Sequence, residues 1–268
     1  MPICSDPALT YLTGYGYNVV RLPSTKIQPL DAMGNEGGQT EWLGSMTQLC
    51  ESRKPPPEVT RHTATAINAT SSSALRLGVG IRILRGILSS FNIDGPALGA
   101  AYSGAKYLRI AIDSPVVRTS NIAEVGEWLL TAKPRKGNPV VKHYFGNPNC
   151  KAYVVTETLT SDSFTVAALD KEHRSVNLSL PGIHQALGGD LDAISASGNT
   201  GELRCVGKEF LTFGFKAYSI VHSFGIWVIS GIRPGEAVCG TSDNSAKPHI
   251  IDDGWLKVRI ARKTKRFR

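Results

Sequence analysis

The strongest constraint on the fold is a succession of β-prone segments in the second half of the 268-residue chain. Residues 150–160 and 163–169 are rich in β-branched and aromatic side chains, and Ser161 and Asp162 between them are common turn residues. This pattern predicts a hairpin whose tip lies at residues 161–162.

Further β-prone runs follow this hairpin. Residues 191–196 and 203–206 flank a Gly-Asn-Thr-Gly turn and predict a second hairpin, and residues 209–223 and 224–232 predict two more strands. Aromatic residues make up only 7% of the chain, and short strands separated by turns are favoured over a helical bundle. The sequence therefore predicts one α+β body with a twisted, mostly antiparallel central sheet and surrounding helices.

Two segments have the pattern of helices that cover a sheet. Residues 74–91 follow three serines, and their apolar side chains recur on one wide face with arginines on another. The glycines within this segment weaken the helix by about 1 kcal/mol each relative to alanine. Residues 121–132 predict a second helix, capped by Asn121. Elsewhere the sequence predicts strands at 59–69 and 105–112, a loop at 31–40 and a short helix at 43–49.

The positive charge of the chain is concentrated at its C-terminal end. The formal net charge is +8, and seven basic residues lie between Gly254 and Arg268, where no acidic residue occurs. The rest of the chain carries 23 basic and 22 acidic groups. The basic composition therefore describes the tail, and it predicts no nucleic-acid-binding surface on the body.

The cysteines and histidines match no catalytic or metal-binding motif. The five cysteines are widely spaced without a CxxC pair, the six histidines are scattered, and the chain contains no HExxH or GxSxG. We expect no catalytic residue, no metal site and no cofactor, although a Cys–His nucleophile pair stays open. The sequence shows no signal peptide and no apolar run of about 18 residues, so a reducing cytoplasm is the expected compartment.

The first thirty residues have a distinctive order of elements. Cys4 precedes a helix-start signal, Ser-Asp-Pro at residues 5–7. The short helix that follows is predicted to end near Gly14, and residues 17–22 predict a strand that ends at Pro23. The unit is thus a cysteine, a short helix, a strand and a turn.

This unit resembles the N-terminal signature of the bacterial gasdermins, small proteins that form pores and kill their own cell after proteolytic activation. The resemblance rests on Cys4, on Gly-Tyr-Asn-Val-Val-Arg-Leu-Pro at 16–23 and on Ile27-x-Pro29-Leu30. It implies a gasdermin N-domain-like fold at residues 1–234. It further implies an exposed linker with a protease cleavage site at 235–249 and a C-terminal inhibitory tail at 250–268.

The resemblance also implies a role for Cys4. In bacterial gasdermins the matching cysteine is palmitoylated, and burying a sixteen-carbon chain contributes on the order of 10 kcal/mol. A thiol beside a helix N-terminus is favoured as the thiolate, although Asp6 opposes this effect. The alternatives are an unmodified thiol and a thiol enzyme that uses Cys4.

The tail has one apolar and one cationic edge. Leu256, Val258 and Ile260 alternate with polar or small residues, and Trp255 precedes them, so residues 250–261 are expected to dock on the body as a strand. The resemblance implies that this docked segment keeps the pore-forming body closed.

The activation that the resemblance implies starts in the linker. Candidate cleavage bonds follow Asp243 and Lys247, and a caspase-like or other protease is the implied activator. The protein would change from a cytoplasmic monomer to a homo-oligomer on inner-membrane lipids. There it would open a large β-barrel pore, with residues 150–169 and 191–217 as membrane strands, and cell death would act as anti-phage defence. The alternative is a non-lytic cytosolic protein whose basic tail binds nucleic acid or anionic lipid.

Overall fold

The protein is built on one large sheet, seen in a computed structural model. The structure describes residues 17–36, 39–64, 75–90, 99, 102–147, 149–176, 194–197, 202–223, 226–229 and 259–260. Within these residues the sheet has 12 strands, and its central path runs in the order β1-β12-β10-β2-β3-β14. The predicted α+β class, with a mostly antiparallel sheet and a few helices, is confirmed.

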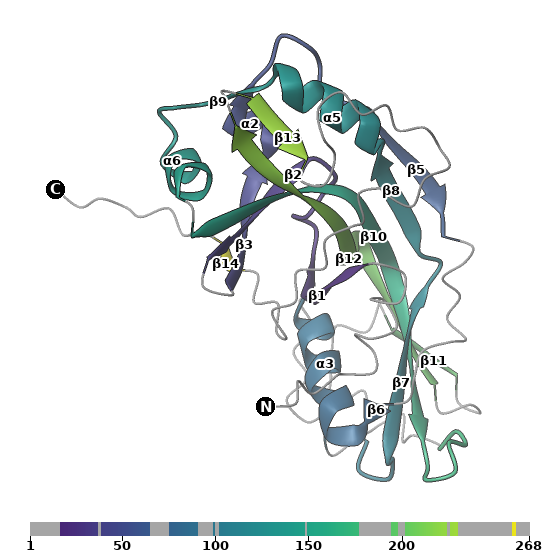
Figure 1. Cartoon of the computed structure of the whole chain (residues 1–268). Helices are drawn as coiled ribbons and strands as arrows, with labels where there is room; N and C mark the ends of the chain where they lie inside the picture. Colours follow the sequence, from purple (N-terminus) through teal and green to yellow (C-terminus); the bar gives the residue numbers. More distant parts are fainter. Residues whose placement is uncertain are drawn as a thin grey trace, which may run out of the picture.

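Two long antiparallel strands form the spine of this sheet. β10 (Cys150–Leu169) and β12 (Glu202–Ser223) pair from Ala152↔Ile220 to Ala167↔Glu202, and they cross the molecule side by side in Figure 1. The other edge of β10 changes partner along its length. It pairs first with β2 (Asp31–Glu36), then with β8 (Val116–Ser120) and finally with β7 (Tyr107–Asp113).

The predicted hairpin at residues 150–169 is wrong, because β10 is one continuous strand. The turn-prone residues at 161–162 instead produce a shift in register with β12. Ser161 is buried, and its hydroxyl accepts a 3.0 Å hydrogen bond from the Ser163 amide and donates a 2.8 Å bond to the Ser163 carbonyl. These bonds satisfy the backbone within a bulge, so the chain need not reverse.

The loop predicted at residues 31–40 is also wrong. Residues 31–36 form β2, and β3 (Gln39–Ser45) pairs with β2 in antiparallel register. Ala32 and Met33 are fully buried, and the Trp42 indole donates a 2.9 Å hydrogen bond to the Asp31 carboxylate. Burial against the rest of the sheet outweighs the polar composition that had indicated a loop.

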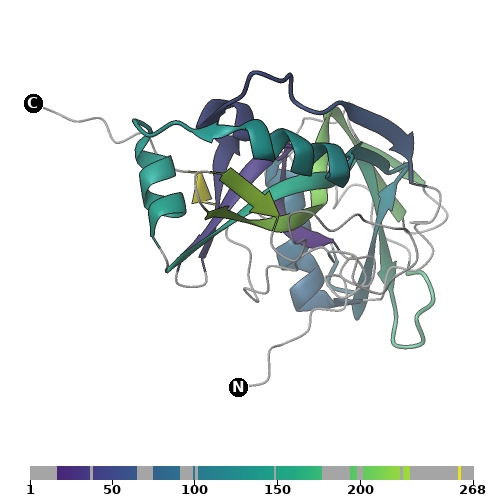
Figure 2. The same cartoon turned by 45° about the horizontal axis from the view of Figure 1, so that its top comes forward.

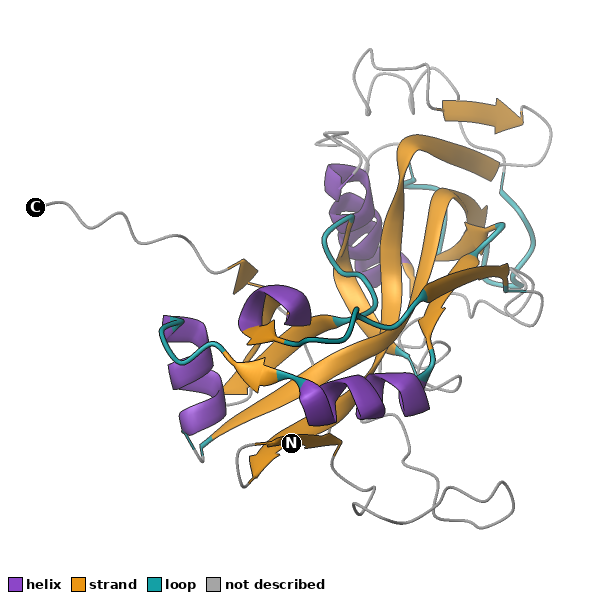
Figure 3. Cartoon of the chain, turned by 90° about the horizontal axis from the view of Figure 1, so that it is seen from above, coloured by secondary structure: helices purple, strands orange, loops and turns teal. Residues whose placement is uncertain are grey.

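The helices lie at two separate places on the sheet. α3 (Leu77–Ser90) confirms the helix predicted at 74–91, and it packs with β7 and with the far ends of β10 and β12 in a core that includes Leu84, Leu88 and Phe164. α5 (Ile122–Thr131) confirms the second predicted helix and its Asn121 cap. Figures 2 and 3 show α5 and α6 (Pro139–Gly146) apart from α3.

The second core lies under α5 and α6. It includes Trp128, Leu129, Val141 and Trp227. α6 was not among the predicted helices, although its start carries a capping signal. Asn138 accepts hydrogen bonds from the Val140 and Val141 amides, and Pro139 occupies the first turn.

Short elements complete the fold. The second predicted hairpin is confirmed, since β11 (Ile194–Ser197) pairs with the start of β12, and β13 (Ile226–Ile229) pairs with its end. The remaining short elements are β1 (Asn18–Ser24), α2 (Met46–Leu49), β4 (Cys50–Glu51), β5 (Val59–Thr63), β6 (Leu75–Arg76), β9 (Lys133–Pro134) and β14 (Arg259–Ile260). Among the described residues, no helix has the length and apolar character needed to cross a membrane.

Candidate functional site

The part of the tail that the structure describes, Arg259–Ile260, forms β14, the outermost strand of the central path. β14 pairs in parallel with β3, with Arg259 opposite Glu41 and Ile260 opposite Trp42. Figure 1 shows this short strand beside β3, at the edge of the sheet near α6. Of the predicted tail residues, Ile260 therefore lies against the body through its backbone.

The other predicted site residues lie outside the described part of the chain. They are the predicted acylation site, the two candidate cleavage residues and the rest of the docked tail segment: Cys4, Asp243, Lys247, Trp255, Leu256 and Val258.

A polar cluster that was not predicted from the sequence lies between the two spine strands. The Lys216 ammonium lies 2.8 Å from the Glu157 carboxylate, which also accepts hydrogen bonds from Thr119, at 3.0 Å, and from the Tyr17 hydroxyl. The ammonium also lies 4.5 Å from the centre of the Tyr17 ring. Three strands, β8, β10 and β12, thus contribute to this cluster, together with Tyr17, the residue that directly precedes β1.

This cluster keeps Glu157 charged within the sheet. Burial by itself raises the pKa of a carboxyl group, but the hydrogen bonds from Lys216 and Tyr17 outweigh burial and hold the pKa of Glu157 below its usual value. Burial, reinforced by the bond to Glu157, raises the pKa of Tyr17. The tyrosine therefore stays neutral and acts as a donor to the carboxylate.

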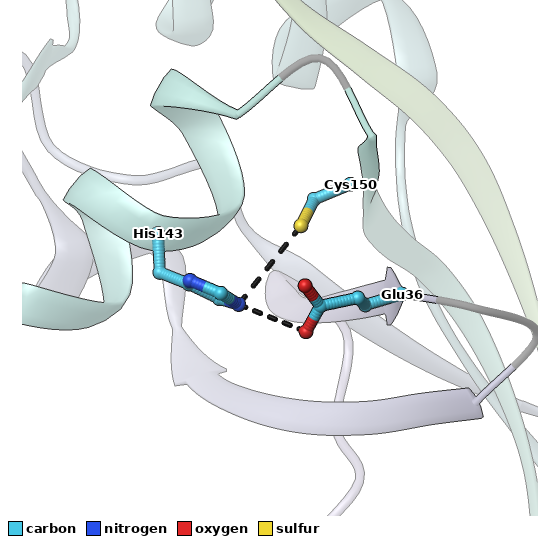
Figure 4. Close-up of side chains that lie close together, drawn as sticks. All are labelled: Glu36, His143 and Cys150. Atoms are coloured by element: carbon cyan, nitrogen blue, oxygen red, sulfur yellow. Dashed lines mark hydrogen bonds and ion pairs between the residues drawn. The ribbon is translucent and has the colours of Figure 1, made fainter.

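A second cluster joins β2, α6 and β10. Figure 4 shows Glu36, His143 and Cys150 pointing toward one another. The His143 Nε2 lies 2.9 Å from a Glu36 carboxylate oxygen and 4.0 Å from the Cys150 Sγ. Glu36, His143 and Cys150 each offer a side-chain atom that can bind a metal, and these three atoms lie within 4.8 Å of one another.

The electrostatics of this cluster do not favour a reactive thiolate. Burial raises the pKa of the Cys150 thiol, and the Glu36 carboxylate beside it raises that pKa further. The hydrogen bond from His143 lowers the pKa of Glu36. The carboxylate and the sulfur also approach the same ring nitrogen, whereas a nucleophile–base–orienter relay uses the two different nitrogens of the imidazole.

Comparisons with known proteins agree with one another. Residues 20–225 match the sequence profile of the Bacterial Gasdermin Family. A gasdermin of Vitiosangium sp. is 35% identical over 264 residues, which are 96% of this chain and 98% of that protein. A gasdermin of Lysobacter enzymogenes is 27% identical over 229 residues, or 84% of each chain.

The fold comparison points the same way. The structure of a bacterial gasdermin from Bradyrhizobium tropiciagri superposes with a TM-score of 0.63 over 84% of this chain and 91% of that one. The sequence identity between the two chains is 18%, so this likeness concerns the fold.

Proposed function

This chain belongs to the bacterial gasdermin family, and from that premise we propose that it is an autoinhibited pore-forming protein. Proteolytic removal of the tail releases the body, which oligomerises in the inner membrane as a large β-barrel pore and kills the cell. It acts by damaging a membrane and not by enzymatic turnover. The death of the cell serves as defence against phage.

The observation that carries this proposal is the position of β14. Arg259 and Ile260 of the tail pair with Glu41 and Trp42, so the tail backbone covers this part of the β3 edge. An uncovered edge presents unpaired N–H and C=O groups, and it is where another chain can join. Releasing β14 would free this edge for a second copy of the body, and edge-to-edge joining is how a closed barrel grows.

The spine strands support a membrane-spanning role. A membrane-crossing strand needs roughly 9–11 residues, and β10 and β12 have 20 and 22 residues. We place the membrane strands in residues 150–169 and 191–217. Because β10 is one continuous strand that pairs with β2, β7 and β8, insertion requires these pairings to break.

The remaining parts of the proposal concern the two ends of the chain. A palmitoyl group on Cys4 would give the released body a lipid anchor. A caspase-like or other protease would cut within residues 235–249, after Asp243 or Lys247. Before cleavage the protein is a cytoplasmic monomer, and afterwards it is an inner-membrane oligomer.

Dye release from anionic liposomes tests the proposal. A protease site inserted at residues 243–247 allows the tail to be released at will, and the unmodified protein treated with the same protease is the matched control. We expect leakage only from the cleaved variant. If neither protein releases dye while Cys4 carries a palmitoyl group by intact mass, the pore mechanism is wrong and the non-lytic binding protein takes its place.

A further inference from the structure

We propose that Glu36, His143 and Cys150 form a binding site for a zinc-like divalent transition-metal ion. The three side chains offer a carboxylate oxygen, an imidazole nitrogen and a sulfur, all within 4.8 Å of one another. These three donor types are the ones that zinc takes in proteins. A bound ion would displace the proton of the Cys150 thiol, and a thiolate ligand favours zinc over magnesium or calcium, which prefer oxygen donors. The proposal goes beyond pore formation and needs no membrane.

The backbone places two of the ligands side by side. Glu36 is the last residue of β2 and Cys150 is the first of β10, and the two residues are directly opposite in the antiparallel register. Directly opposed residues project to the same face of the sheet, with their Cβ atoms about 5 Å apart. The sulfur and the carboxylate therefore meet without any rearrangement of the strands.

The third ligand comes from a helix that is held close to the same strands. The ring of Tyr144 lies directly over Gly34 of β2, where a methyl group would be 2.5 Å from two ring carbons. The Tyr144 hydroxyl also donates a 3.2 Å hydrogen bond to Glu41 of β3. Tyr144 thus holds α6 against β2 and β3, and the neighbouring His143 therefore lies close to Glu36 and Cys150.

The distances between the ligand atoms are close to those that a bound zinc ion would require. A tetrahedral zinc ion with ordinary bond lengths holds its nitrogen about 3.3 Å from an oxygen ligand and about 3.6 Å from a sulfur ligand. The corresponding distances here are 2.9 Å and 4.0 Å. The sulfur and the carboxylate oxygen lie within 4.8 Å of each other, against about 3.6 Å in a tetrahedral zinc site, so shifts of up to about 1 Å would seat the ion. Both of these ligands already face the same Nε2 (Figure 4).

The surroundings leave room for a fourth ligand. Cys150 is buried, whereas the side chains of His143 and Glu36 keep 48% and 47% of their surface exposed. Three protein ligands with one open side leave a position for water. A bound ion would tie α6 to β2 and β10, next to β3, the strand on which β14 docks.

Metal titration of the full-length, uncleaved and reduced protein tests the site. Calorimetry with zinc should show one site, and cobalt should produce a thiolate-to-metal charge-transfer band. The ligand variants Glu36→Gln, His143→Gln and Cys150→Ser should each weaken zinc binding by at least about tenfold. Cys150→Ser should also lose the cobalt band. Zinc should raise the unfolding temperature of the wild type, because it binds the folded chain.

Matched controls separate this site from other thiols and imidazoles. His62→Gln, an exposed histidine on β5, and Cys50→Ser, a buried cysteine outside the cluster, should keep wild-type zinc affinity. Gly34→Ala should weaken binding without removing a ligand atom, whereas Gly137→Ala, with open space at its Cβ, should not. Unchanged affinity in both His143→Gln and Cys150→Ser, with circular dichroism showing folded protein, would overturn the proposal.

Discussion

At the scale of single residues, the ion pair between Glu157 and Lys216 ties the two spine strands together. Their side chains are 21% and 24% exposed, so water screens the pair only in part. The pair sits where the register of β10 and β12 shifts, between Val155 and Glu157. An unpaired Lys216 at this position would carry the cost of a partly buried charge.

Replacing Glu157 with glutamine should lower stability in a pH-dependent way. The pKa of Glu157 is lowered in the folded protein, so its stabilisation is present above the unfolded pKa near 4.5 and is lost as the pH falls through the folded pKa. Glu157→Gln should reduce the free energy of unfolding by about 1–3 kcal/mol at pH 7. The difference from wild type should shrink in acid.

Urea unfolding at several pH values measures this difference. Glu58→Gln changes an exposed carboxylate and serves as the control, which should follow the wild type. A constant difference between wild type and Glu157→Gln from pH 7 down to pH 3 would contradict the assignment of the charge to Glu157.

At the scale of elements, α3 is held more by packing than by its own helix propensity. It contains Gly78 and Gly80, two residues apart, and their environments differ. A methyl group at Gly78 meets nothing within 4 Å, whereas one at Gly80 lies 2.9 Å from the Cβ of Leu108, a fully buried residue of β7. The close approach of α3 to the sheet therefore depends on Gly80.

These two glycines should respond to alanine in opposite directions. Gly78→Ala should raise the free energy of unfolding by about 0.5–1 kcal/mol, because alanine has the higher helix propensity. Gly80→Ala should lower it, because the methyl group forces α3 away from Leu108. Chemical denaturation of the two variants beside wild type decides the matter, and an equal gain from both would show that Gly80 is not a contact point.

At the scale of the whole molecule, the tail is the part whose position is expected to control activity. β14 pairs with β3 at the end of the central path, where β10, β2 and β3 separate it from β12. Its contact with the body is through the edge of the sheet. Charged side chains within a docked strand are costly where they must face an apolar surface. The docking can therefore be weakened without cutting the chain.

Substituting two apolar tail residues should make the uncleaved protein active. Trp255→Glu combined with Ile260→Glu should stop growth of cells that express it and release dye from liposomes without protease. The double variant Lys265→Glu and Arg266→Glu changes residues beyond the docked segment, and the uncleaved protein should then stay inactive in both assays. Normal growth with the first pair would argue that the tail does not hold the body closed.

The sequence by itself determined α3 and α5, the second hairpin and the family. α3 and α5 follow from local signals, namely a helical repeat of apolar residues and the Asn121 cap, so their residues carry the information. The N-terminal signature, Cys4 with residues 16–23 and 27–30, indicated the family whose profile residues 20–225 then matched. Local signals such as these depend only on neighbours along the chain.

Only the tertiary structure decided the path of β10 and the two polar clusters. Ser161 has the propensity of a turn residue, but pairing with β12 on one side and with β7 and β8 on the other holds the chain extended. Glu36 and His143 are 107 positions apart, and cysteine and histidine spacing therefore predicted no metal site. They meet because the register of β2 with β10 and the packing of Tyr144 on Gly34 bring them together. The spacing of residues along the chain shows neither the register nor this packing.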